Sequence, residues 1–195
     1  MPDPVLRIEG LACQRGDRLL WRGIDASLAP GDALHVVGAN GSGKSSLLRV
    51  VAGLLPAAAG RVEAAPLGLV DEAHALDRDR PLTAALAFWA RIDGRPASAI
   101  APALDRLGIA HLADVPVRFF STGQRRRAAL ARLLVSEARL WLLDEPANGL
   151  DRDGVGLLAA LIAGHRASGG AVLLASHQPL ALDALATLDL AEYGA

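Results

Sequence analysis

Four short apolar runs divide the chain and are separated by longer stretches with a helical pattern. Each run consists mostly of Leu, Val and Ala, and the runs cover 33–38, 67–70, 140–145 and 171–176. Strands that are buried on both faces of a parallel sheet have this near-continuous apolar character, because neither face meets water. The pattern therefore predicts a buried parallel sheet.

Between these runs, leucines and valines recur at the three- and four-residue spacing of an amphipathic helix. The predicted apolar faces comprise Leu47, Leu48, Val51, Leu54 and Leu55; Leu130, Leu133 and Leu134; and Leu157, Leu158, Leu161 and Ile162. The residues 168–171 read SGGA and predict the turn from a helix into the last strand. Alternation of buried strands with helices is typical of the α/β class.

The segment 81–115 departs from this alternation. It is rich in alanine, has helical spacing and contains no obvious strand. We therefore expect a single domain over residues 1–195, in which a helical subdomain of approximately 78–138 is inserted into the strand–helix core.

A glycine-rich stretch between a predicted strand and a predicted helix fits the pattern G-x-x-x-x-G-K-[ST]. Its glycines let the backbone turn tightly, so that N–H groups converge on phosphate oxygens, and the helix N-terminus adds the positive end of its dipole. We expect Lys44 to reach the β- and γ-phosphates and the Ser45 hydroxyl to bind Mg²⁺. The predicted nucleotide-binding residues are Gly38, Ala39, Asn40, Gly41, Ser42, Gly43, Lys44, Ser45 and Ser46.

An acidic pair, Asp144 and Glu145, ends one apolar run and is followed by Pro146. Ligands bind at the carboxyl ends of parallel strands, and Pro146 interrupts the strand so that two adjacent carboxylates can serve one site. We expect Asp144 to hold Mg²⁺, directly or through water, and Glu145 to polarise the attacking water. A solvent-exposed Asp-Glu pair is the simpler alternative, which the upstream phosphate loop disfavours.

Composition and charge narrow the function. The 195 residues are 52% apolar but only 4% aromatic, and the formal net charge is −1. A protein that neutralises phosphates along a duplex usually carries a positive excess, so no nucleic-acid partner is expected. Cys13 is the only cysteine, which excludes an internal disulfide. Residues 1–10 lack the pattern of a signal peptide, and no apolar stretch approaches the ~20 residues of a membrane span.

Three further motifs, taken in order with the phosphate loop and the acidic pair, resemble those of the ATP-binding-cassette (ABC) ATPases. FSTGQ at 120–124 is similar to the family's signature, ANGLD at 147–151 looks like its D-loop, and SHQ at 176–178 looks like its switch-histidine loop. The resemblance spans about 5–190. It implies a P-loop NTPase of the α/β class, with a mixed or parallel sheet core, that hydrolyses ATP with Mg²⁺.

The resemblance also implies a catalytic centre shared between two chains. In the family, the signature of one subunit closes over the triphosphate held by a second, so that a homodimer sandwiches two ATP molecules head to tail. The resemblance implies that Ser121, Gly123 and Gln124 cap the triphosphate of the partner and that Asp151 reaches across the dimer. The implied catalytic residues are Lys44, Glu145 and His177.

Simple alternatives exist for two of these residues. Asp151 precedes a predicted helix that starts near Arg152, where it could serve as an N-cap, alone or in addition to a role across the dimer. A single histidine after a strand, such as His177, is more often an ordinary surface or packed residue, although its order after the acidic pair favours the functional reading. Ser121 and Gly123 lie where a helix N-terminus forms an anion site.

Three consecutive arginines, Arg125, Arg126 and Arg127, follow the signature. One of them could approach the ATP of a partner subunit, but cations at a helix N-terminus oppose the dipole. For at least two of the three we expect a solvated face that covers neighbouring carboxylates. Contact with DNA is disfavoured by the charge balance.

The chain departs from the family pattern at three places. Arg15 stands before Gly16, where the family usually has an aromatic residue that stacks on adenine. The family's glutamine after the strand at 67–70 is missing from VDEAHALD, where Glu72 or His74 could substitute. Thr122 replaces a glycine of the signature, and a β-branched residue narrows backbone freedom there.

Several stretches resemble the ATPases of bacterial haem exporters that serve cytochrome c maturation. They are STGQRRRAALARLL from Ser121, LWLLDEPANGLD followed by RDG, SHQPL from Ser176, and Leu82-Thr83. This resemblance implies a separate integral membrane permease as partner and peripheral association, through it, with the cytoplasmic face of the bacterial inner membrane. The five histidines lack ligand-like spacing, so no haem ligand is predicted.

The sequence is also compatible with three other functions. One is the ATPase of another small-substrate exporter, and a second is a non-transport ABC ATPase that acts on nucleic acid or a soluble complex. The third is a P-loop kinase of small molecules that works as a monomer, against which the signature and the D-loop argue.

Overall fold

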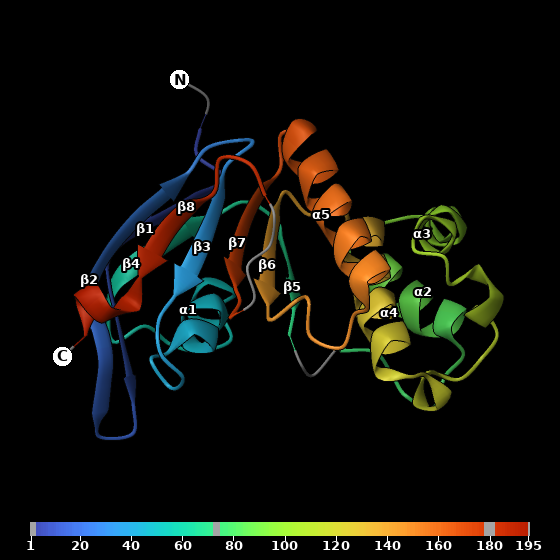
Figure 1. Ribbon diagram of the computed structural model, residues 1–195, viewed down its shortest axis with the longest axis horizontal. Coiled ribbons are helices and arrows are strands. Elements are labelled where there is room, and N and C mark those ends of the chain that lie inside the picture. The colour runs from blue at the N-terminus through green and yellow to red at the C-terminus, as the bar shows by residue number, and fades with distance from the viewer. Residues whose placement is uncertain (1–2, 72–74, 178–181, 195) are drawn as a thin grey trace.

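The computed structural model describes residues 3–71, 75–177 and 182–194, which form two sheets flanked by helices (Figure 1). The antiparallel sheet consists of β1 (Leu6–Arg15), β2 (Arg18–Leu28) and β4 (Ala59–Ala64). The parallel sheet consists of β3 (Ala33–Val37), β5 (Leu67–Val70), β6 (Leu140–Asp144), β7 (Ala171–Ala175) and β8 (Ala186–Asp189). The α-helices are α1 (Lys44–Val51), α2 (Leu82–Ile92), α3 (Ile100–Arg106), α4 (Thr122–Ser136) and α5 (Arg152–Ala167).

The parallel sheet has the strand order β5-β6-β7-β3-β8 and confirms all four predicted strands. Every residue of β6 and β7 is buried, which explains their unbroken apolar sequences. The edge strand β8 was not predicted, because its sequence ATLD exposes two of its four residues and forms no apolar run. The carboxyl ends of β3, β5, β6 and β7 meet at one edge of the sheet, where ligands bind in such folds.

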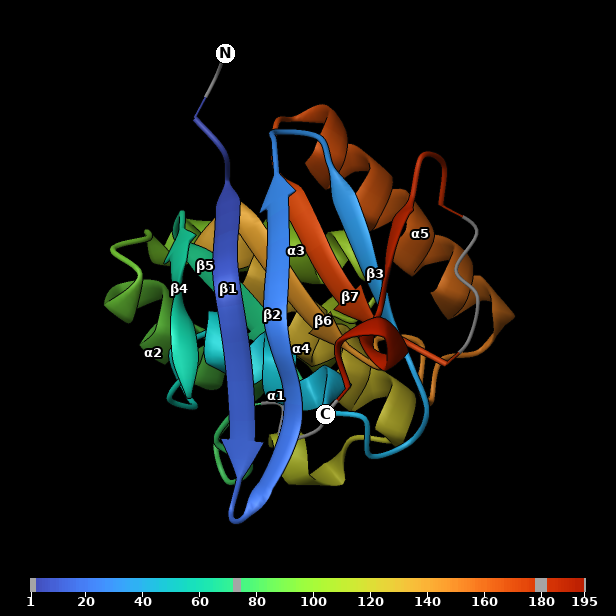
Figure 2. The same ribbon diagram turned by 90° about the vertical axis from the view of Figure 1, so that its left-hand side faces the viewer.

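The antiparallel sheet was missed by the sequence analysis. Its strands β1 and β2 lie across one face of the parallel sheet and are much longer than the parallel strands (Figure 2). The pairing of β1 with β2 shifts register between Ile8 and Leu11, on either side of Gly10, whose φ is 57°. Such a bulge changes which side chains face the core, so no single period of two runs through the strand.

Two apolar cores flank the parallel sheet. On one face, β1, β2 and α1 pack against it through residues such as Trp21, Leu47 and Leu142. On the other face, α4, α5 and the helical insertion cover it through residues such as Leu133 and Leu158. Figure 1 shows this order of layers, with the antiparallel sheet and the helical insertion at opposite ends. The parallel sheet is thus buried on both faces, as its sequence predicts.

The helix α1 ends earlier than its apolar face suggested. Gly53 has φ 71°, and its N–H bonds to the Val50 carbonyl while the Leu54 N–H bonds to the Arg49 carbonyl. These two bonds form a Schellman motif, which ends the helix at the glycine. Leu54 therefore lies beyond α1 and is 68% exposed, so its assignment to the apolar face was wrong.

The segment 81–115 forms α2, α3 and short 3₁₀ turns, with no strand among these fully described residues. Its core side chains pack against α4 and include Leu82, Leu86 and Leu104. The prediction of a helical insertion is therefore confirmed for this segment. No helix in the described parts of the chain combines the length and the apolar character that a membrane crossing requires.

Candidate nucleotide-binding and hydrolysis site

The loop between β3 and α1 can be built only with glycine at two positions. Gly38 and Gly43 have φ of 146° and 100°, in the region that L side chains rarely adopt. A Cβ on Gly38 would lie 2.7 Å from Ser42 Oγ, and one on Gly43 would lie 2.6 Å from Trp21 Nε1. The loop backbone therefore lies directly against its supporting side chains, which leaves its other side free to approach a ligand.

Lys44 lies inside this loop rather than in solvent. Its side chain is only 7% exposed, and its Nζ donates to the carbonyls of Gly38 (2.8 Å) and Ala39 (3.1 Å). The helix α1 begins at Lys44 and has no side-chain cap, so its first N–H groups stay available to an anion. Asn40, Gly41, Ser45 and Ser46 lie in the same loop and first turn. The geometry fits the predicted phosphate cradle.

Asp144 and Ser45 meet at the carboxyl edge of the sheet. Asp144 is the last residue of β6 and is 6% exposed. Burial raises the pKa of its carboxyl, and a hydrogen bond with the Ser45 hydroxyl opposes that shift. Among the described residues there is no group of three or more His, Cys, Asp and Glu that could hold a metal. One carboxylate and one hydroxyl suit Mg²⁺, which takes its remaining ligands from phosphates and water.

Glu145 leaves the strand in a left-handed backbone conformation, with φ 46°. Its N–H donates to the Ala175 carbonyl at 2.8 Å, while its carboxylate accepts the N–H of His177 at 3.2 Å. The Nε2 of His177 lies 3.4 Å from the other carboxylate oxygen. The structure therefore brings two predicted catalytic residues together at the end of β7. The left-handed backbone of Glu145 ends strand β6, one residue before Pro146.

The signature residues form the N-terminus of α4 and a groove beside it. Ser121 is the N-cap, and its Oγ accepts the Gln124 N–H (3.2 Å) while Gln124 Oε1 accepts the Ser121 N–H (2.8 Å). This reciprocal pair is a capping box. The adjoining groove of about 460 Å³ is lined by 121–124, Arg127 and 149–151. The predicted anion site is thus a preformed surface, although the capping box already uses the Gln124 N–H.

Thr122 and Gly123 pack tightly against the D-loop-like segment. A Cβ on Gly149 would lie 2.6 Å from Thr122 Cγ2, and one on Gly123 would lie 3.1 Å from the Gly149 carbonyl. The methyl group of Thr122 therefore occupies the space that Gly149 leaves open. In the described chain, the groove residues form no hydrogen bond or ion pair with the loop that holds Lys44.

Asp151 is the N-cap of α5, since its Oδ1 accepts the Gly154 N–H at 2.8 Å. This confirms the simpler of its two predicted roles. The same oxygen lies 3.6 Å from Arg127 Nη2, so Asp151 also joins α5 to α4. Because Asp151 lines the groove as well, the cap leaves a further role across a dimer open.

The expectation of a solvated arginine face is wrong. Arg126 is 3% exposed, and Arg125 and Arg127 are half-buried. Their guanidinium groups donate to backbone carbonyls: Arg125 to Phe120, Arg126 to Asp71, and Arg127 to Leu107. The carbonyls of Asp71 and Leu107 come from loops distant in sequence, so these two acceptors could not be seen in the sequence, whereas Phe120 directly precedes the signature helix cap.

The structure describes only some of the residues at which the chain departs from the family pattern. Arg15 is exposed at the end of β1, in the hairpin with β2. Glu72, His74 and Gln178 lie outside the described residues. Their neighbour Asp71 is described and forms an ion pair with Arg49 of α1, a contact that sequence analysis missed and that no local pattern signals.

A glycine-rich loop around a buried lysine follows β3, and an acidic pair ends β6, which lies two strands away in the same parallel sheet. This arrangement is that of a P-loop ATPase. The family model described as ABC transporter matches residues 21–148. In fold, the chain matches an ATP-binding protein of an ABC transporter from Pyrococcus furiosus, with a TM-score of 0.84 at 22% identity, over 97% of this chain and 99% of that one.

Proteins similar in sequence show to which family within the ABC transporter ATP-binding proteins the chain belongs. A cytochrome c biogenesis ATP-binding export protein CcmA from Sphingopyxis alaskensis is 55% identical over 179 residues, which is 91% of this chain and 92% of the relative. The protein of the same name from Novosphingobium aromaticivorans is 50% identical, over 94% of each chain. The chain belongs to the ABC transporter ATP-binding proteins and, within them, to the family of CcmA cytochrome c biogenesis export ATPases. It is therefore an ABC ATPase coupled to transport, and such subunits pair with permease subunits.

Proposed function

We propose that the chain is the ATP-hydrolysing subunit of a complex that exports or releases haem at the bacterial inner membrane for cytochrome c biogenesis. The observation that carries the proposal is the 55% identity, over nine-tenths of both chains, to a CcmA export protein. The chain acts at the cytoplasmic face of that membrane, as a peripheral subunit bound through its permease.

The hydrolytic chemistry is assigned to the residues at the carboxyl edge of the parallel sheet. Lys44 and the N–H groups of 38–46 bind the triphosphate, because the loop closes around a buried ammonium. Ser45 and Asp144 would hold Mg²⁺, which supplies charge neutralisation for the phosphates. Glu145 takes the proton of the attacking water, and His177, in contact with that carboxylate, lies where it senses the loss of the γ-phosphate.

The second half of the centre comes from another copy of the chain. The groove beside α4 presents the Ser121 hydroxyl and the helix N-terminus, yet among the described residues it forms no hydrogen bond or ion pair with the loop of its own chain that holds Lys44. Ser121, Gly123 and Gln124 therefore cap the triphosphate bound by a partner copy, and Asp151 reaches across the same interface. Two copies enclose two ATP molecules.

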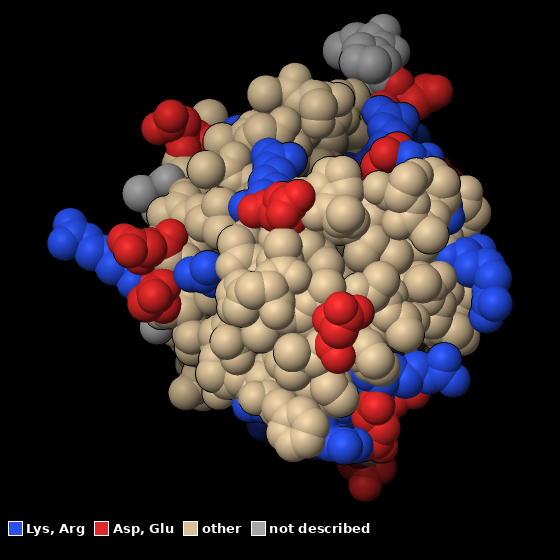
Figure 3. Space-filling model, turned by 90° about the vertical axis from the view of Figure 1, so that its right-hand side faces the viewer, with Lys and Arg blue, Asp and Glu red and all other residues tan. Residues whose placement is uncertain are grey.

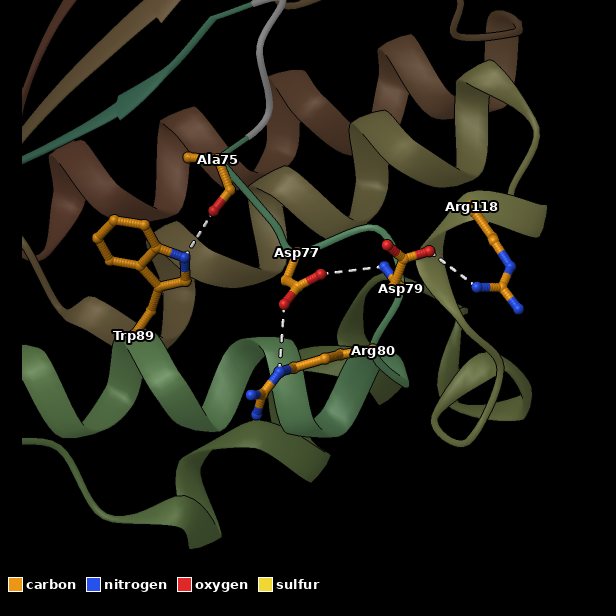
Figure 4. Close-up of polar contacts among 6 residues, drawn as sticks. All are labelled: Ala75, Asp77, Asp79, Arg80, Trp89 and Arg118. Atoms are coloured by element: carbon orange, nitrogen blue, oxygen red, sulfur yellow. Dashed lines mark hydrogen bonds and ion pairs between the residues drawn. The ribbon is translucent and has the colours of Figure 1, made fainter.

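For the permease we assign a pocket of about 280 Å³ beside α2, lined by Ala75, Asp77, Arg80, Ala85, Phe88 and Trp89. Trp89 Nε1 donates to the Ala75 carbonyl at 2.7 Å, and Asp77 pairs with Arg80 at 3.2 Å, so the walls are fixed (Figure 4). The ion pair between Asp79 and Arg118 (2.8 Å) braces the adjoining segment, as Figure 4 also shows.

Apolar side chains stand exposed around this pocket. Phe88 is 46% exposed, and Ile92 and Phe119 are exposed further. Seen from the side of α2 and α3, uncharged side chains cover most of the face (Figure 3). An apolar segment of an integral membrane subunit fits such a surface, since aromatic anchors in a pocket favour protein contacts.

Affinity purification of the tagged chain from its own membranes tests the proposal. We expect an integral membrane permease to co-purify, and we expect Phe88→Ser to release it while Arg91→Ser, an exposed change on the same helix, retains it. Cells that carry only Glu145→Gln should fail to make haem-loaded cytochrome c. Recovery of RNA, DNA or a soluble complex instead of a permease would support the non-transport alternative.

A further inference from the structure

Asp71 lies where three elements of the nucleotide site meet. It is the first residue after β5, and because Val70 pairs with Leu143 in the parallel register, Asp71 follows beside Asp144 at the carboxyl edge of the sheet. We propose that Asp71 is a positioning residue that joins the phosphate-binding helix α1 to the signature helix α4, through contacts with Arg49 and Arg126. The inference rests on the proposed ATP site at 38–46.

The first contact joins Asp71 to α1. Arg49 lies in the last turn of α1, and its Nη2 is 3.6 Å from Asp71 Oδ2. The Asp71 side chain is only 15% exposed, so water screens the pair less than a surface ion pair. A shift of α1 when phosphates enter the loop ahead of it therefore acts directly on Asp71.

The second contact joins Asp71 to α4. The almost fully buried Arg126 donates from Nη1 to the Asp71 carbonyl at 3.4 Å. This bond connects the Asp71 backbone to a guanidinium that α4 carries into the interior. Arg126 follows the N-cap Ser121 by about one and a half turns of α4. The position of Asp71 thus sets that of the signature residues that cap a partner's triphosphate.

This junction stands where the family's glutamine is missing. Asp71 brings a negative charge beside Asp144, but Arg49 offsets it, since the two groups shift the pKa of the Asp144 carboxyl in opposite directions. A charge-balanced Asp–Arg pair can therefore lie next to the metal-binding carboxylate. The pair of Asp71 and Arg49 thereby links the phosphate-binding end of the site to α4 in the helical layer.

Amide hydrogen exchange with and without MgADP tests the inference. ADP occupies the phosphate loop but lacks the γ-phosphate that a partner's signature would cap, so a response in α4 must pass through the chain itself. In the native protein we expect MgADP to slow exchange by about fivefold or more in both α1 and the first two turns of α4. In Asp71→Asn and Arg49→Gln we expect α1 to respond as before and α4 to lose most of its response.

Glu9→Gln is the matched control, because it removes one carboxylate from an ion pair with Arg61 that lies between β1 and β4, away from this junction. It should respond like the native protein. Equal slowing of α4 in the native protein, Asp71→Asn and Arg49→Gln would overturn the inference, as would an α4 that never responds. If Asp71→Asn fails to fold, Arg49→Gln carries the test, since Arg49 is 43% exposed. Absence of slowing in α1 and the loop of the native protein would instead refute the proposed ATP site.

Discussion

At the scale of single residues, Glu145 has the surroundings of a base. Its left-handed backbone turns the carboxylate out of the strand, and His177 holds it by a backbone N–H. Glu145→Gln keeps the size and an acceptor for that N–H but removes the basic oxygen. We expect kcat to fall by about 10²–10⁴-fold while ATP still binds, and an ATP-loaded dimer to accumulate. Turnover and gel filtration in ATP measure both effects, and an undiminished rate would show that another group is the base.

The buried carboxyl of Asp144 leads to a prediction of how the stability of the fold depends on pH. Because burial raises its pKa in the folded protein, its charged form destabilises the fold, and this penalty is absent below the unfolded-state pKa and complete above the folded-state pKa. Without nucleotide and Mg²⁺, Asp144→Asn should therefore raise the thermal midpoint at neutral pH. The gain should vanish as the pH approaches the ordinary aspartate pKa of about 3.9. A lower midpoint at neutral pH would contradict this.

At the scale of elements, Asp151 combines a helix cap with a contact between helices. Asp151→Ala removes the bond to the Gly154 N–H and the pair with Arg127, so we expect a loss of about 1 kcal/mol in the free energy of unfolding. Asp151→Asn keeps the cap and should retain most of that stability. Denaturant unfolding measures these values.

The same two variants separate the roles of Asp151 in catalysis. If Asp151 also reaches across a dimer, Asp151→Asn should lower turnover although it folds with nearly native stability. Native turnover in Asp151→Asn would leave Asp151 with structural roles, the N-cap and the contact with Arg127.

The elements differ in how far the sequence predicts them. The strands β6 and β7 are buried on both faces and β3 and β5 are at least partly buried at every position, so their apolar sequences follow from their surroundings. The loop with Lys44 has a spacing set by phosphate geometry. The strands β1 and β2 could not be predicted, because the shift at Gly10 breaks their period. The burial of Arg126 and Arg127 depends on carbonyls from loops distant in sequence, which no local pattern contains.

At the scale of the whole molecule, one copy of the chain carries both halves of the proposed catalytic centre but does not join them. The groove beside α4 stays separate, in hydrogen bonds and ion pairs among the described residues, from the loop around Lys44. Turnover per subunit should therefore rise with protein concentration and level off once dimers form. A dilution series of initial rates measures this, and a constant specific activity would favour the monomeric kinase.

Mixing two inactive variants tests the shared centre most directly. Lys44→Ala removes the phosphate-binding ammonium, and Ser121→Arg fills the groove, so each variant alone should be inactive. A mixed dimer pairs the intact loop of one chain with the intact signature of the other, and we expect an equal mixture to regain about a quarter of the native ATP turnover, because half of its dimers carry one intact centre. If the mixture stays inactive although the subunits exchange and each variant keeps its fold, the centre is not shared between two chains.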